Sequence, residues 1–136
     1  MKKWCYFLIL LLFLPIVSAD ISLTSSLKAS YNIGDSLQLT GSVKEAATLE
    51  GILSYSILCD NSTMQVGASY LKLNANEGQA FSEALKIPDS LIGSCLIQIN
   101  LSSGNFSDSF SSSNFIVTKD LGGNFDIGRK EIQLGD

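Results

Sequence analysis

The 136-residue sequence contains no histidine, only two prolines and one tryptophan, and few charged residues, 16% in all. Histidine is the commonest general base and the usual activator of a nucleophile, so its absence removes the most frequent catalytic arrangements. No serine lies in a nucleophile-elbow pattern, and carboxylates such as Asp60, Glu83 and Asp89 are scattered along the chain. We therefore expect a protein that is not an enzyme and that carries no cofactor and no metal ion.

Long apolar runs are also missing, except for one at the N-terminus. Two lysines precede an apolar run over residues 4–17. A membrane-spanning helix needs about 20 apolar residues, so this run is too short to cross a bilayer. The small residues that end it are typical of a signal-peptidase site, which predicts a secretory signal peptide over residues 1–19 and cleavage before Asp20. The alternative is an uncleaved N-terminal anchor.

Basic residues are few once the signal peptide is removed. Its two lysines leave seven basic residues against 13 acidic ones, a net charge of −6 over residues 20–136. Nucleic acids and anionic membranes are bound by basic surfaces. We therefore expect no nucleic-acid partner, and a membrane link only through the signal peptide or through an anchor that follows the sequence.

Cysteine is scarce, and its placement matters. Cys5 leaves with the signal peptide, so Cys59 and Cys95 remain as an even pair in an exported, oxidising setting. A disulfide is the expected state of such a pair, and two buried free thiols are the alternative. Two cysteines without a histidine do not supply the four ligands of a structural zinc site.

The rest of the chain has a β pattern throughout, because apolar residues recur with period two in short runs separated by turn residues. Alternation of this kind predicts strands with one buried face and no long helix. The number of runs predicts an all-β fold, an antiparallel β-sandwich of about seven strands. The expected strand regions are 21–31, 37–43, 53–59, 64–73 (as two short edge stretches, 64–66 and 70–73), 81–87, 95–101 and 110–118. Disorder is the alternative for the serine-rich stretch 111–113.

Two stretches carry a family resemblance. Residues 31–43, Tyr-Asn-Ile-Gly-Asp-Ser-Leu-Gln-Leu-Thr-Gly-Ser-Val, combine an aromatic, a Gly-Asp turn, an alternating strand and a glycine. This pattern resembles the opening of Ig-like modules in prokaryotic surface proteins, including the second-domain type of macroglobulin-like proteins. Residues 87–97 are similar to the approach to the sixth strand of such modules, with Cys95 where a tyrosine often lies. The resemblance covers roughly residues 20–119 and implies a fold rather than an activity.

The Ig-like order implies where the two cysteines lie. The third and sixth strands are antiparallel neighbours in one sheet, Cys59 ends the third, and Cys95 begins the sixth. Both cysteines also belong to inward-facing sets, so they are expected to form a structural disulfide rather than a redox centre. This pairing differs from the usual immunoglobulin bridge, which joins the second and sixth strands across the core.

A short internal repeat suggests a second module. The sequence Ile-Gln-Leu-Gly-Asp at 132–136 repeats the pattern of Tyr-Asn-Ile-Gly-Asp at 31–35, about one hundred residues later, which is the length of one Ig-like domain. Residues 120–136 are therefore interpreted as a linker and the first strand of a truncated second module. Three Asn-x-Ser/Thr sequons, at Asn61, Asn100 and Asn105, are candidate glycosylation sites in a host that has the transferase.

These features together favour a non-catalytic module of an exported cell-surface or secreted protein, with a spacing, adhesion or display role. We expect it to be the N-terminal unit of a tandem array. Its partner would be a protein or carbohydrate at the cell surface, bound through loops or a sheet edge. The alternative is an accessory binding module of a larger extracellular enzyme, a receptor or a macroglobulin-like protease trap.

Overall fold

The computed structural model describes residues 19–104 and 106–119, and these residues are all-β. Most of the predicted signal peptide and all of the predicted linker and second module lie outside the described residues. None of the described residues belongs to a helix long and apolar enough to cross a membrane. The strands are β1 (Asp20–Leu23), β2 (Ser30–Asn32), β3 (Ser36–Lys44), β4 (Leu49–Cys59), β5 (Ser62–Leu73), β6 (Gly78–Lys86), β7 (Gly93–Ser103), β8 (Phe106–Ser111) and β9 (Phe115–Thr118).

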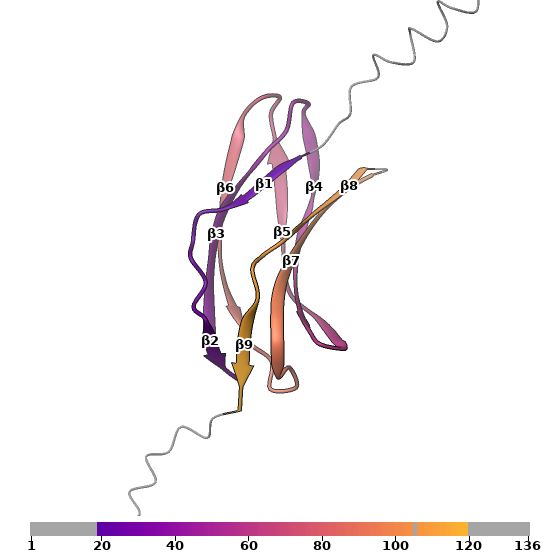
Figure 1. Cartoon of the computed structure of the whole chain (residues 1–136). Helices are drawn as coiled ribbons and strands as arrows, with labels where there is room; N and C mark the ends of the chain where they lie inside the picture. Colours follow the sequence, from indigo (N-terminus) through magenta and orange to yellow (C-terminus); the bar gives the residue numbers. More distant parts are fainter. Residues whose placement is uncertain (1–18, 105, 120–136) are drawn as a thin grey trace, which may run out of the picture.

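The strands form two open sheets that face each other (Figure 1). The smaller sheet has the order β1-β3-β6, and the larger one has the order β2-β9-β7-β4-β5, with β8 also paired to β7. All neighbours are antiparallel except β2 and β9. The predicted antiparallel sandwich is confirmed.

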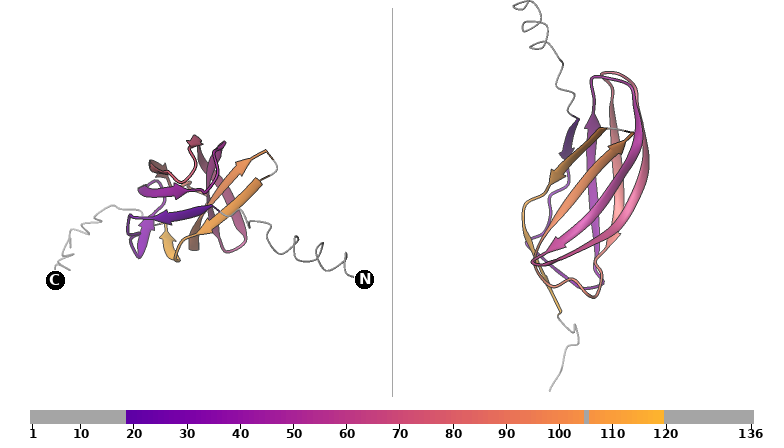
Figure 2. Two further views of the ribbon diagram at one scale, coloured as in Figure 1. Left: turned by 90° about the horizontal axis from the view of Figure 1, so that it is seen from above. Right: turned by 90° about the vertical axis from the view of Figure 1, so that its right-hand side faces the viewer.

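The two ends of the described chain lie at opposite ends of the sandwich (Figure 2). Asp20 pairs with Lys44 at the end of β3, and we call this end of the molecule the N-pole. The carbonyl oxygen of Thr118 accepts a hydrogen bond from the amide of Ile33, just before β3 begins, at what we call the C-pole. The nine residues of β3 separate the two poles, a distance of about 30 Å.

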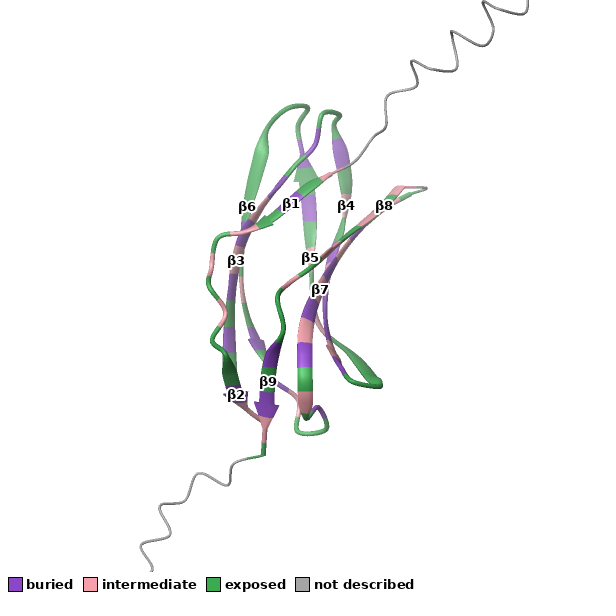
Figure 3. Ribbon diagram, in the orientation of Figure 1, coloured by how far each residue is buried: buried purple, intermediate pink, exposed green. Residues whose placement is uncertain are grey.

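The core lies between the sheets, and buried residues alternate with more exposed ones most regularly along β3, β7 and β9 (Figure 3). The inward rows predicted for 53–59 and 95–101 are fully buried. Burying one large apolar side chain stabilises the fold by about 1.5–3 kcal/mol. Near the C-pole, Tyr31 packs edge-on against Phe115, with ring centroids 5.3 Å apart. The tyrosine that opens the family-like stretch is therefore a core residue.

The predicted first strand, 21–31, is wrong as a single element. β1 belongs to the smaller sheet and β2 to the larger one. The amides of Thr24 and Ser25 both donate to the carbonyl of Thr40, which ends the β1 ladder. The chain then crosses to the other sheet, where the amide of Ile116 donates to the carbonyl of Ala29.

The predicted pair of short edge stretches, 64–66 and 70–73, is a single edge strand, β5. It pairs only with β4, and the register shifts so that Val66 is an extra residue between the pairs Tyr55–Gly67 and Ser56–Gln65. A bulge of this kind inverts the alternation of side chains partway along a strand. The inversion explains why the sequence pattern indicated two stretches.

The predicted last strand, 110–118, is also divided, into β8 and β9. The stretch expected between the strands 95–101 and 110–118 is much shorter, because β7 runs to Ser103 and β8 begins at Phe106. Between β8 and β9, Ser112 forms two hydrogen bonds with the backbone of Ile97 on β7. Its hydroxyl oxygen accepts the Ile97 amide at 2.9 Å, and its own amide donates to the Ile97 carbonyl at 2.9 Å. In the serine-rich stretch, Ser111 therefore ends β8 and Ser112 is hydrogen-bonded to β7.

Candidate functional site

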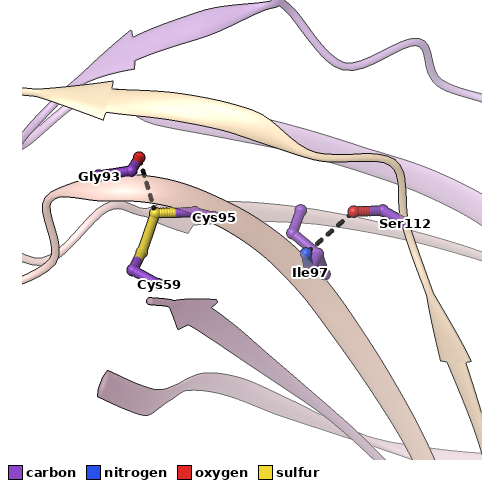
Figure 4. The surroundings of a disulfide bond; sticks show 5 residues. All are labelled: Cys59, Gly93, Cys95, Ile97 and Ser112. Carbon is purple, nitrogen blue, oxygen red and sulfur yellow. Dashed lines mark hydrogen bonds between the residues drawn. A yellow bond between two sulfur atoms is a disulfide. The ribbon is translucent and has the colours of Figure 1, made fainter. Parts of the chain in front are cut away.

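The disulfide lies on the buried face of the larger sheet, near the C-pole (Figure 4). Cys59 and Cys95 are direct partners across β4 and β7, with Cα atoms 4.0 Å apart. The next pair is hydrogen-bonded, since the amide of Asp60 donates to the carbonyl of Ser94 at 3.1 Å. The cysteines therefore occupy the non-hydrogen-bonded position of the ladder, where opposing Cα atoms come closest. The pairing implied by the Ig-like order is present.

The surroundings of the disulfide indicate a structural role. Cys59 and Cys95 are only 2% and 1% exposed, so a thiolate in solution cannot reach either sulfur atom. The Sγ atom of Cys95 lies 3.5 Å from the Gly93 carbonyl oxygen. A bridged sulfur atom carries no proton, so this approach is a packing contact. Nothing in this geometry activates a thiol.

The outer face of the larger sheet has a polar, uncharged character at its centre. Its side chains come from the non-core positions of β4, β7 and β8, which the register places side by side. We call this surface the outer polar face and define it by Ser54, Gln98, Asn100, Ser102, Ser107, Ser109 and Ser111; Ser56 belongs to the same row of β4 but is only 9% exposed. Hydroxyl and amide groups both donate and accept hydrogen bonds, so the surface suits a polar partner without charge.

Two apolar side chains border the outer polar face on β4 and β5. Tyr70 is 65% exposed and lies directly opposite Ile52, which is 53% exposed. An exposed tyrosine offers a large apolar ring together with a hydroxyl group, and such residues are enriched where proteins bind partners. The outer polar face and Tyr70 together are the best candidate for a binding surface on the described residues.

A salt bridge lies beside Tyr70. The Lys72 ammonium donates to the Glu50 carboxylate at 3.0 Å, across the β4–β5 pair. Hydrogen bonding to Lys72 holds the pKa of the Glu50 carboxyl below its usual value, and the same contact raises the pKa of Lys72. Both side chains are more than half exposed, so the pair contributes little to stability. The Glu50–Lys72 pair lies at the edge of the uncharged surface.

The three sequons differ in their settings. Asn61 is exposed in the turn between β4 and β5. Asn100 is half-buried in the outer polar face, with Ser54 beside it on β4 and Ser109 on β8. Asn105 lies outside the described residues. Glycosylation of these asparagines stays a prediction.

The scattered carboxylates do not form a metal site in the part of the chain that the structure describes. There, no three histidine, cysteine, aspartate or glutamate side chains converge. Two shallow depressions do occur. One, of about 330 Å³, lies near the C-pole between Met64–Val66 and Lys86–Asp89. The other, of about 260 Å³, lies at the N-pole around the turn from Asn74 to Glu77.

Sequence reasoning missed the outer polar face as a continuous surface. No strand was predicted between residues 101 and 110, so Ser107 lay outside the expected strands, although that residue belongs to β8. The signal that could have found the surface is the run Ser107, Ser109 and Ser111, in which serine recurs at every second residue. Tyr70 was assigned to an edge strand, but its exposure could not be read from the alternation because the bulge at Val66 inverts it.

Comparisons with known proteins define the fold but not a family. No family model matches the chain, and no curated protein matches its sequence. Solved structures do match at the level of the backbone. The sporulation control protein Spo0M of Bacillus subtilis aligns with a TM-score of 0.52 and 15% identity, over 74% of this chain and 49% of Spo0M.

Two other solved structures have similar folds. A β-glucosidase of Erythrobacter marinus aligns with a TM-score of 0.55 and 15% identity, over 75% of this chain and 16% of the enzyme. The C-terminal domain of wzt aligns with a TM-score of 0.52 and 12% identity, over 79% of this chain and 81% of that domain. The chain thus spans about half of Spo0M and a small part of the glucosidase. At these identities the likeness concerns the all-β fold alone.

Proposed function

We propose that this chain is a non-catalytic module of an exported cell-surface or secreted protein, and that it spaces and displays what lies beyond its ends. The observation that carries the proposal is the placement of Asp20 and Thr118 at opposite poles of the sandwich. A domain whose ends lie at opposite poles adds its full length to a chain of domains. Such an arrangement extends an array by about 30 Å per module.

The disulfide supports the same proposal. A bridge between neighbouring central strands holds β4 and β7 together where the chain leaves the sandwich. Disulfides persist in oxidising compartments and are rare in the cytosol of most organisms. A buried bridge of this kind suits a module that works outside the cell.

The spacing proposal is tested by changing the number of modules. A surface-displayed protein would carry an N-terminal epitope and either one or two copies of residues 20–136. We expect the second copy to move the epitope away from the membrane by at least the length of one sandwich, about 30 Å, in an optical or force-based height measurement. A matched control protein, in which the second copy is replaced by the same number of glycine and serine residues, should give a smaller, compressible increase. Equal heights with one and two modules would contradict a spacing role.

A second candidate function is favoured by the outer polar face. As an accessory binding module, the chain would hold an uncharged polar partner, such as a neutral carbohydrate, against this surface and the ring of Tyr70. The hydroxyl and amide side chains would exchange hydrogen bonds with the ligand's hydroxyl groups. The exposed ring would cover an apolar face of the ligand.

Binding of neutral polysaccharides by the wild-type chain and its variants tests this second function. Tyr70→Ala should weaken binding about tenfold or more, whereas Tyr70→Phe should retain most of it because the ring stays in place. Ser109→Arg places a charge on the surface without touching the core and should also weaken binding. Unchanged binding in Tyr70→Ala and Ser109→Arg would place the ligand elsewhere.

A further inference from the structure

Glu45 is the one charged residue among the buried ones in the described part of the chain. It follows the last residue of β3 and continues the inward row of Leu39, Gly41 and Val43, so its carboxylate lies at the N-pole between the two sheets. The residue is only 2% exposed. Its Oε1 atom accepts a hydrogen bond from the neighbouring Ala46 amide at 2.8 Å.

The other carboxylate oxygen, Oε2, is buried and has no hydrogen-bond partner among the described residues. A buried carboxylate oxygen without a partner costs stability, because it has left water without gaining a hydrogen bond. Lys44 is next in sequence but lies on the exposed side of the strand. The position therefore calls for a donor that the described residues do not supply.

The register of β1 with β3 shows which part of the chain runs alongside this end of β3. Asp20 and Lys44 are the last pair of the β1–β3 ladder, and one further step of the same antiparallel register would set Ala19 opposite Glu45. Ala19 is partly buried and packs against the core, on the same side as Ile21. In this extended register the peptide bond between Ala19 and Asp20 lies next to Glu45 at the N-pole. This is the bond at which the sequence predicts signal-peptide cleavage.

Cleavage changes the chemistry at this position. Hydrolysis of the peptide bond by one water molecule leaves a carboxylate on the released Ala19 and an amine on Asp20. An α-amino group has an ordinary pKa of about 7.7–8.0, so the new terminus is mostly protonated at neutral pH. Loss of Ala19 also removes a partly buried residue at this end of the core. The α-ammonium group of Asp20, which has three hydrogen-bond donors, then takes the place of Ala19 near Glu45, whose Oε2 atom has no partner among the described residues.

We propose that the buried carboxylate of Glu45 is the binding site for the α-ammonium group of Asp20 that signal-peptide cleavage creates. The precursor carries the unpaired acid, and the mature chain pairs it. The sandwich thus becomes more stable only after the leader has been removed, which leaves the precursor easier to keep unfolded for export. This inference rests on the exported state in the proposed function.

The test compares two chains that differ in where the ammonium group lies. One begins at Asp20 and the other at Ala19, both end at Asp136, and both are released from a fusion by a protease that leaves no extra residue. The extra residue moves the charge by about 3.8 Å along the strand. Each chain is made with Glu45 and with Glu45→Gln, and the equilibrium constant for unfolding is measured in denaturant.

With Glu45 present, we expect the chain that begins at Asp20 to have an unfolding constant about tenfold smaller than the chain that begins at Ala19. In Glu45→Gln the two starting points should differ by less than twofold, because the amide carries no charge. Equal stability of the two Glu45 chains would overturn the proposal, and so would an equally large difference in Glu45→Gln.

Chemical blocking provides a test that does not depend on the folding of the glutamine variant. Acetylation of the Asp20 amine removes the charge and should raise the unfolding constant of the Glu45 chain about tenfold, whereas acetylation of the chain that begins at Ala19 should change it little. Equal effects on both chains would overturn the proposal. N-terminal sequencing of the exported protein reports separately on the cleavage site, so a failure of export and a failure of the ion pair give different results.

Discussion

At the scale of single residues, Gly41 is a position in β3 that leaves no room for a side chain. A side chain at this position would overlap the backbone carbonyl of Ser22 on β1 and the ring of Phe81, its direct partner on β6. Gly41 is the glycine of the family-like pattern in residues 31–43, and the packing on both sides of β3 requires it there. Gly78, at the N-pole end of the same sheet, has only one ordinary contact within reach, with the Val43 carbonyl at 3.9 Å.

Replacing each of these two glycines by alanine distinguishes the cost of a clash with close neighbours from the small effect that alanine itself has in a strand. We expect Gly41→Ala to lower the free energy of unfolding by about 2–3 kcal/mol, because the methyl group must displace backbone or a core ring. Gly78→Ala should change it by no more than about 0.5 kcal/mol. Denaturant unfolding of both variants measures the difference, and similar losses in the two would contradict the packing assigned to Gly41.

The disulfide is the second residue-scale feature with a large expected effect. Cys59 and Cys95 are 36 positions apart, and the chain-entropy account gives a bridge of this span about 4 kcal/mol. We expect the double variant Cys59→Ala, Cys95→Ala to lose about 3–4 kcal/mol of unfolding free energy under oxidising conditions. When the wild-type disulfide is reduced, the unfolding free energies of the double variant and the wild type should differ much less. If oxidation leaves the wild-type stability unchanged, the bridge does not act as a staple.

At the scale of elements, Ser112 lies between β8 and β9, where the regular ladder with β7 is interrupted, and it remains hydrogen-bonded to Ile97 of β7. Its hydroxyl accepts the Ile97 amide between the end of β8 and the start of β9 (Figure 4). Ser112→Ala should leave that amide without a partner and lower the unfolding free energy by about 1–2 kcal/mol. Ser113→Ala, at the next and exposed position, is the control and should be neutral. Faster hydrogen exchange at Ile97 in the Ser112 variant alone would support the assignment.

The strands differ in how far the sequence predicts them. The inward rows of β4 and β7 follow from unbroken alternation, so their burial and the cysteine pair were predicted correctly. The sheet switch between β1 and β2 was not, because it depends on two amides that share the Thr40 carbonyl. The bulge at Val66 and the break at Ser112 are also local hydrogen-bond arrangements. The periodicity of apolar residues predicts which face of a strand is buried. It does not predict where a strand changes sheet, bulges or breaks.

The candidate sites divide in the same way. The disulfide followed from two cysteines in two clear strands. The outer polar face depends on the alignment of three strands, and Glu45 depends on the register between β1 and β3. In the sequence, Glu45 belongs to a polar link between two strands, and nothing nearby indicates that it is buried. Long-range register was needed to place either surface.

At the scale of the whole molecule, the sandwich has its start and its finish at opposite poles, and each pole has a distinct feature. The N-pole holds Glu45 beside the predicted cleavage point, and the C-pole holds the disulfide. Under the proposed function, the first feature would concern the maturation of an exported chain and the second its oxidation. The central claim is therefore that the domain is exported, cleaved and oxidised.

Peptide mapping of the exported protein by mass spectrometry, under non-reducing conditions, tests this claim most directly. The account predicts an N-terminal peptide that begins at Asp20 and a linked pair of peptides that contain Cys59 and Cys95. Reduction should separate the linked pair and leave the N-terminal peptide unchanged. A protein that retains Met1 and carries both cysteines as free thiols would contradict the account.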